Sequence, residues 1–180
     1  MNNMKKMYIT SGTYDYLWRL QQKHRKRGFI IMHNKDHTLL LEETEKRSIF
    51  RLPRTYEIIE ERGELPKTGF AHFYYYPVSE ENRSLFEHYV LKGAHRLFNN
   101  KGLVAFRFLR PVKRDSYIFL TIWEDEAYFQ LWKKGQSFAE AFNIHESKLK
   151  KIPQPFPDPA YGISYTIGEK EEKEETEGNL

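Results

Sequence analysis

The sequence predicts an α+β protein in which two ferredoxin-like halves pair within one chain. Together they would form a roughly eight-stranded antiparallel β-barrel flanked by helices, like a dimeric α/β-barrel. The second half reads strand–helix–strand–strand–helix–strand, which is the ferredoxin-like order, and the first half reads as a shortened version of it. The 180 residues are 39% hydrophobic and 16% aromatic, enough for one ring-rich core. Because two four-stranded halves can share that core within one chain, we expect a monomer.

The N-terminal half, residues 1–66, opens with the β-prone run MYITSG and continues into a helix. Thr13 is a suitable helix cap, Leu17 and Leu20 have helical spacing, and Gly28 is a stop signal. This pattern predicts one strand followed by one amphipathic helix.

The rest of this half predicts further strands. The runs Phe29–His33 and Thr38–Glu42 are rich in β-formers and flank the polar NKD, which indicates a hairpin. SIFRL, Ser48–Leu52, predicts a fourth strand, and PRTYEIIEERGEL predicts a short helix or turn that leads out of the half.

The C-terminal half, residues 67–168, begins with a strand over Phe70–Val78. Ser79 is positioned to cap a helix with Glu80 and Glu81 in its first turn. The expected inner face of this helix carries apolar residues at helical spacing: Leu85, Phe86, Tyr89, Val90 and Leu97. LVAFRFLRP and YIFLTIWE then predict two strands.

A final aromatic stretch, YFQLWKKGQSFAEAFNIH, is the most informative one for function. Asp125 or Glu124 can start a helix whose expected inner face is Ala127, Tyr128, Leu131 and Trp132. After Gly135, helical spacing continues through Phe138, Ala141, Phe142 and His145. These rings can simply pack as core, or they can wall a flat apolar slot with a histidine at one end. A proline-rich connection and the strand ISYTIG complete the half.

Charge is unevenly distributed along the chain. The formal net charge is +4, and residues 169–180 form an acidic tail that we expect to be disordered. The densest basic run, Lys23–Arg27, can meet phosphates or an anionic membrane surface, or can be a solvated helix end that suits the helix dipole. No aromatic residues interleave with this run, so we expect no nucleic-acid partner.

Several classes of chemistry are excluded by what the sequence lacks. With no cysteine, disulfides, thiolate catalysis and cysteine-ligated metals are ruled out. Neither a glycine-rich phosphate loop nor a nucleophile elbow is present, and the seven histidines form no zinc pattern, so we expect no metal site. His72, in a strand pattern, is best interpreted as a hydrogen-bonded structural histidine. No apolar run is long enough for a transmembrane helix, and no signal peptide is recognisable, which favours a cytoplasmic protein, with membrane association left open.

Motifs along most of the chain resemble one family. IFLTIWEDEAYFQLWKKGQSFAEAF, following the FRFLRP strand, resembles the antibiotic-biosynthesis-monooxygenase (ABM) domain. MYITSGTYDYL, LLLEET, YEIIEERGEL and FRFLRPVK together resemble the signal transduction protein TRAP family (target of RNAIII-activating protein). The near relatives of that family are the HmoB-type haem-degrading monooxygenases. The resemblance spans about Met4 to Ile167 and implies an ABM domain, residues 67–168, fused to a second ferredoxin-like half.

The resemblance also implies where a haem site would lie. The related haem degraders use an asparagine, a tryptophan and a histidine. The tryptophan corresponds to Trp132, whereas the asparagine falls at Tyr74 and the histidine at Phe142. Phenylalanine cannot ligate iron, and tyrosine lacks the geometry of an amide. His145, one helical turn beyond Phe142, is the only nearby substitute ligand in the sequence.

The family's phosphorylated histidines are not matched in this chain. By alignment they fall near Gly69 and Asn82, so that role does not carry over.

We therefore expect a non-catalytic TRAP-like protein with a signalling or stress-response role and an unidentified protein partner. Its pocket would be built from Tyr74, Trp132, Phe142 and His145. The alternative is a haem-binding or haem-degrading monooxygenase with a non-standard site, in which Trp132 and His145 are the catalytic candidates and haem the cofactor. A third interpretation is an anionic-ligand binder that uses Arg107, Arg110 or the Lys23–Arg27 run.

Overall fold

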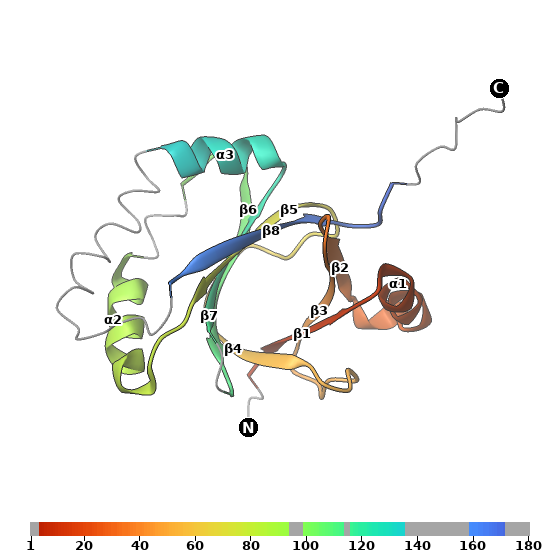
Figure 1. Ribbon diagram of the computed structural model, residues 1–180, viewed down its shortest axis with the longest axis horizontal. Coiled ribbons are helices and arrows are strands. Elements are labelled where there is room, and N and C mark those ends of the chain that lie inside the picture. Colours follow the sequence, from red (N-terminus) through yellow and green to blue (C-terminus); the bar gives the residue numbers. More distant parts are fainter. Residues whose placement is uncertain (1–3, 94–98, 114–115, 136–158, 172–180) are drawn as a thin grey trace.

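The computed structural model describes residues 4–93, 99–113, 116–135 and 159–171. Its strands close into an antiparallel barrel in the order β1-β3-β2-β8-β5-β7-β6-β4, drawn as a ring in Figure 1. The predicted eight-stranded barrel is confirmed for the described part of the chain. The first half supplies these elements: β1 Lys6–Gly12, α1 Tyr14–Lys23, a 3-10 turn at Arg25–Arg27, β2 Ile30–His33, β3 Thr38–Thr44 and β4 Arg54–Arg62. The second half supplies the others: β5 Gly69–Tyr76, a 3-10 turn at Glu80–Asn82, α2 Arg83–Gly93, β6 Leu103–Pro111, β7 Tyr117–Trp123, α3 Glu126–Lys134 and β8 Tyr161–Ile167.

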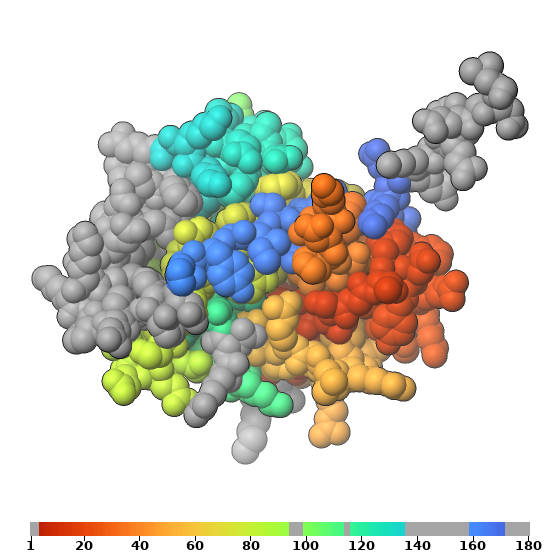
Figure 2. Space-filling view, viewed as in Figure 1, coloured from red at the N-terminus to blue at the C-terminus, as the bar shows by residue number. Residues whose placement is uncertain are grey.

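The two halves are joined by strand pairing at two seams. β4 of the first half pairs with β6 of the second, from Tyr56 opposite Pro111 to Arg62 opposite Phe106. The other seam, between β2 and β8, has two residue pairs, Met32 with Ile167 and His33 with Thr166. Figure 2 shows the blue β8 segment lying against the N-terminal half. Barrel closure therefore depends on one long seam and one short one.

Strand alternation sorts the side chains into an interior and an outer layer. In β5, Ala71, Phe73 and Tyr75 point into the barrel core, whereas Phe70 and Tyr74 belong to the cluster beneath the helices of the second half. A third cluster, which includes Leu17, packs α1 against the outside of β2 and β3. Figure 1 accordingly shows α1 on one side of the barrel and α2 and α3 on the other.

One predicted strand was assigned to the wrong residues. Ser48–Leu52 is irregular, with Leu52 92% exposed, while the fourth strand is β4 over Arg54–Arg62, where we expected a helix or turn. The reason is tertiary: β4 pairs with β1 on one side and β6 on the other and buries Tyr56 in the core. Pro53 lies immediately before the strand, where a missing N–H is harmless.

Two expected helix boundaries are also corrected. Thr13 caps α1 as predicted, its hydroxyl accepting from the backbone N–H of Tyr16 at 3.3 Å. The helix ends at Lys23, however, and Gly28 (φ +71°) closes the following 3-10 turn instead. Ser79 precedes a 3-10 turn and makes no side-chain cap bond to the backbone, and α2 starts only at Arg83.

The expected inner faces of α2 and α3 need correction as well. Phe86 and Val90 of α2 are buried, but Leu85 is 41% exposed, and Leu97 lies outside the described residues. In α3, capped by Asp125 as predicted, the buried residues are Phe129 and Trp132. Ala127 and Leu131 face solvent, because turning the larger Phe129 and Trp132 rings inward buries more apolar surface.

No helix in the described part of the chain combines the length and apolarity needed to span a membrane.

Candidate functional site

The candidate site lies on the outer face of β5, beneath α3. Trp132 projects from α3 and is 5% exposed, with its ring centroid 5.1 Å from that of Trp123 and 6.1 Å from that of Phe129. The helix reaches this position because Asp125 caps it, accepting from the backbone N–H of Tyr128, directly after β7 ends at Trp123. The Trp132 side chain is thus buried against other aromatic rings and has little contact with solvent.

Tyr74 belongs to the same aromatic cluster as Trp132. In β5 it pairs in register with Phe119 on one side and Gly162 on the other. Its ring lies 4.9 Å from Tyr76 and 5.9 Å from His72, centroid to centroid. The structure therefore brings two of the predicted pocket residues to one layer of the fold. Phe142 and His145 lie outside the described residues, so their place in the pocket stays a prediction.

His72 is a member of this surface that the sequence did not single out as a site residue. It is 8% exposed, its Nδ1 lies 3.0 Å from Ser164 Oγ, and its ring stacks on Phe129 at 4.4 Å with 28° between the planes. The hydrogen bond confirms the structural role predicted for it. The available signal was strand periodicity, because His72 lies two residues before Tyr74 and so faces the same way.

The environment of His72 keeps it uncharged. Burial, with a smaller contribution from Lys133, lowers its pKa to about 4, so the imidazole is neutral at physiological pH. The His72 ring also packs closely against Gly162 of β8. A Cβ at position 162 would lie 2.5 Å from His72 Cε1, so only glycine fits there. His72 is therefore a neutral imidazole buried among aromatic rings, and Lys133 is the cation that influences it.

The arginines proposed as anion ligands are engaged within the chain. Arg107, 2% exposed, bonds Glu43 through Nε at 2.6 Å and donates Nη1 to the carbonyls of Arg62 and Phe106. Arg110 bonds Glu87 through Nη2 at 2.8 Å and Glu57 through Nη1 at 2.9 Å. Both guanidinium groups thus stabilise the barrel and the docking of α2, which argues against an anionic ligand at either arginine.

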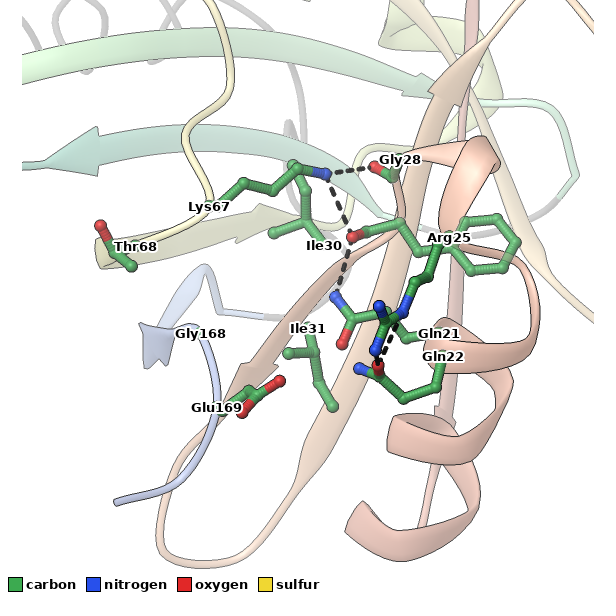
Figure 3. Close-up of a pocket in the computed structure, with 11 residues that line it drawn as sticks. Gln21, Gln22, Arg25, Gly28, Ile30, Ile31, Lys67, Thr68, Gly168 and Glu169 are labelled. Atoms are coloured by element: carbon green, nitrogen blue, oxygen red, sulfur yellow. Dashed lines mark hydrogen bonds between the residues drawn. The ribbon is translucent and has the colours of Figure 1, made fainter.

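The basic run Lys23–Arg27 borders a hollow of about 550 Å³ between α1, β2 and the end of β8 (Figure 3). Both arginines of this run have partners in the chain. Arg27 forms a bidentate pair with Glu42 at 2.8 Å, and Arg25 bonds Gln22 Oε1 at 2.6 Å through Nη2.

Lys67, on the opposite wall of the hollow, is also occupied. Its Nζ donates to the carbonyls of Gly28 at 2.7 Å and Phe29 at 3.2 Å, close to where the short β2–β8 seam ends. Burial lowers the pKa of this ammonium group. The cations of this hollow, Lys67 and Arg25, therefore already have hydrogen-bond partners in the chain, and the carboxylate of Glu169 lines the hollow as well.

The comparisons with known proteins agree with this geometry. Residues 70–143 match the family model described as antibiotic biosynthesis monooxygenase, and these residues include β5, α3 and the aromatic cluster between them. The signal transduction protein TRAP of Staphylococcus epidermidis is 27% identical over 137 residues, which are 76% of this chain and 82% of that protein. The predicted resemblance to the TRAP and ABM proteins is confirmed.

Other TRAP-like and ABM-like proteins extend the comparison. A heme-degrading monooxygenase of Listeria monocytogenes is 23% identical over 141 residues, 78% of this chain and 84% of that protein. Among solved structures, a major regulator of staphylococcal pathogenesis superposes with a TM-score of 0.81 at 23% identity, covering 91% of this chain and 98% of that one. A heme-degrading enzyme from Listeria monocytogenes superposes with a TM-score of 0.67 at 20% identity, covering 89% and 98%. At these identities the superpositions establish a shared fold.

Proposed function

We propose that this chain is a TRAP-like ABM protein with a signalling or stress-response role and no haem-degrading activity. The observation that carries the proposal is the presence of Tyr74 on the outer face of β5. Tyr74 stands where the haem-degrading relatives are expected to have asparagine, and it packs against Tyr76 and His72 rather than presenting an amide. Relatives named signal transduction protein TRAP support the signalling part of the proposal.

The described residues give limited support to a haem-degrading site. Of the three expected side chains, Trp132 is present, Tyr74 replaces the asparagine, and the position of the histidine lies outside the described part of the chain. His72 is a poor substitute for the axial ligand, because it is 8% exposed and its ring is packed between Phe129 and Gly162, where a Cβ on Gly162 would lie only 2.7 Å from its Nε2.

Haem binding with degradation is the second candidate, favoured by the retained Trp132 and by the Listeria relative named heme-degrading monooxygenase. A haemin titration separates the two candidates. The purified protein is titrated while the Soret band is followed, and a reductant and oxygen are then added. Our proposal expects no loss of the band. Saturable binding that His145→Ala abolishes, with bleaching of the bound haem, would establish the alternative.

A pair of substitutions makes the test sharper. Tyr74→Asn combined with Phe142→His restores the side chains that the resemblance expects beside Trp132. If this face is an altered haem site, we expect the double variant to bleach haemin in the presence of reductant while the wild type does not. Tyr76→Asn with Phe142→His is the matched control. Tyr76 is two residues after Tyr74 in β5 and therefore lies on the same face of the strand. Equal activity in both double variants would show that Tyr74 does not occupy the asparagine position.

A further inference from the structure

A groove lies on the first half of the molecule, away from the aromatic face of β5. It has a volume of about 550 Å³ and runs between α1, the end of β1 and the irregular segment that replaces the expected strand at Ser48–Leu52. This size is within the range of small-molecule sites, about 300–1,000 Å³.

Three large apolar side chains are exposed along this groove. Leu52 is 92% exposed, Tyr16 is 57% exposed and Ile49 is 41% exposed, and all three line the groove. They come from α1 and from the 49–52 segment, two parts of the chain that meet only in the folded protein. Single exposed apolar residues are ordinary, but several lining one concave surface indicate a binding site.

The charges of the groove all have one sign. Among the described residues that line it, the charged ones are Lys23, Arg51 and Arg54, and none carries a carboxylate. Among the described residues, neither the Lys23 nor the Arg51 side chain has an ion-pair partner. Arg27, Arg107 and Arg110, by contrast, are each bonded to at least one glutamate. The groove thus places the cations of Lys23 and Arg51, unpaired within the described part of the chain, next to exposed apolar side chains.

We propose that this groove binds amphipathic anions, molecules with one carboxylate or phosphate and an acyl or alkyl chain. The anionic group would pair with Lys23 and Arg51, with Arg54 adding positive potential, and the chain would cover Tyr16, Ile49 and Leu52. Charge complementarity selects the anion, because the described lining of the groove holds cations and no carboxylate that would repel it. The exposed apolar rim selects the chain, because covering it removes apolar area from water. The hollow in Figure 3 has a similar volume, but its Lys67 and Arg25 already have partners and Glu169 lines it.

Calorimetric titration of the full chain tests the proposal with decanoate, decyl phosphate, decanol and inorganic phosphate, each below any micelle-forming concentration. We expect saturable binding of decanoate, decyl phosphate or both, and none of decanol or inorganic phosphate. Stronger binding of decanoate identifies a fatty-acid type of ligand, and stronger binding of decyl phosphate identifies a lipid-phosphate type. Amide NMR shifts at Tyr16, Arg51 and Leu52 on addition of the ligand would place it in the groove.

Substitutions then test the named contacts. Lys23→Glu and Arg51→Glu should each weaken binding about tenfold or more, as expected for reversing a charge close to an anion. Leu52→Ala should weaken binding of the alkyl anions through lost apolar contact. Lys35→Glu, an exposed lysine in the β2–β3 turn, is the matched control and should leave affinity unchanged. Equal affinity for decanol and decanoate, equal effects of all three charge reversals, or binding only to anionic vesicles and not to monomeric ligands would each overturn the proposal.

Discussion

At the scale of single residues, burial decides what each titratable group can do. His72 is surrounded by rings and by Ser164, and its pKa falls to about 4, whereas an exposed histidine has a pKa near 6.5. Arg107 and Arg110 are held by carboxylates, so their charges support the fold. In the groove beside α1, by contrast, the basic side chains of Lys23 and Arg51 lack such partners within the described residues, so their charges are free to bind an anion.

His72 should make the protein less stable as the pH falls. In the folded state it stays neutral down to about pH 4, while in the unfolded chain it takes up a proton near pH 6.5. The unfolded state therefore binds more protons between those values, and stability present above pH 6.5 is lost progressively towards pH 4. The loss is on the order of 3 kcal/mol at its largest.

Urea unfolding at several pH values measures this effect. His72→Phe keeps a ring against Phe129 but cannot take up a proton, so its unfolding midpoint should depend less on pH between 6.5 and 4. A pH dependence identical to that of the wild type would show that other groups, such as His33, whose pKa burial also lowers, are responsible.

At the scale of elements, the position of a strand is decided by its partners. β4 has hydrogen-bonding neighbours on both sides and a fully buried Tyr56, whereas Ser48–Leu52 has neither a strand partner nor, apart from Phe50, a buried side chain. Both stretches contain β-forming residues, so local propensity does not separate them. Closure of the barrel does, since it requires a strand between β1 and β6.

A pair of alanine substitutions tests this assignment. Tyr56→Ala removes a ring from the barrel interior and should reduce the free energy of unfolding by about 3–5 kcal/mol. Leu52→Ala, in the stretch where the sequence suggested a strand, should change it by less than about 0.5 kcal/mol, because Leu52 is 92% exposed. Chemical denaturation gives both values, and comparable losses would contradict the observed position of the fourth strand.

Helix α2 is fastened to the barrel by a charged cluster. Glu87 accepts hydrogen bonds from Arg110 and from the hydroxyl of Tyr117, the latter at 2.8 Å. Burial alone would raise the pKa of Glu87, but the bonds from Arg110 and Tyr117 outweigh it and the pKa is lowered. The stabilisation is therefore present at neutral pH and is lost as the pH falls through the lowered pKa of the folded state.

Glu87→Gln should loosen α2 without unfolding the barrel. Hydrogen exchange at pH 7 should become faster in Arg83–Gly93, while exchange in β5 and β7 stays unchanged, because those strands are held by their own ladders. Glu81→Gln, at an exposed glutamate in the preceding 3-10 turn, is the matched control. Equal protection of α2 in the two variants would show that the charged cluster does not hold the helix.

At the scale of the whole molecule, the barrel closes within one chain. Each strand has a neighbour on both sides, so the described part of the chain leaves no open sheet edge for a second copy to complete. Closure also places the two candidate sites on different parts of the barrel exterior. The aromatic face of β5 lies under the helices of the second half, and the groove beside α1 lies on the first half.

Because closure needs no second chain, we expect a monomer in solution. Light scattering coupled to size exclusion should give a mass near 21.7 kDa at micromolar concentration. A stable species of about twice that mass would show that a surface other than a sheet edge mediates self-association.

Much of the architecture was determined by the sequence itself. The order of strands and helices, the Thr13 and Asp125 caps, the β2–β3 hairpin and the shared barrel follow from periodicity and turn chemistry that act over a few residues. Tyr74 and Trp132 were identified by resemblance, and their meeting in one cluster follows from the fold. The tertiary structure alone decided where β4 lies and which face of α3 turns inward. It also decided that Arg107 and Arg110 form ion pairs with glutamates. Finally, it placed Lys23, Arg51 and Leu52 in one groove. These features depend on contacts between residues far apart in the chain, and only barrel closure brings those residues together.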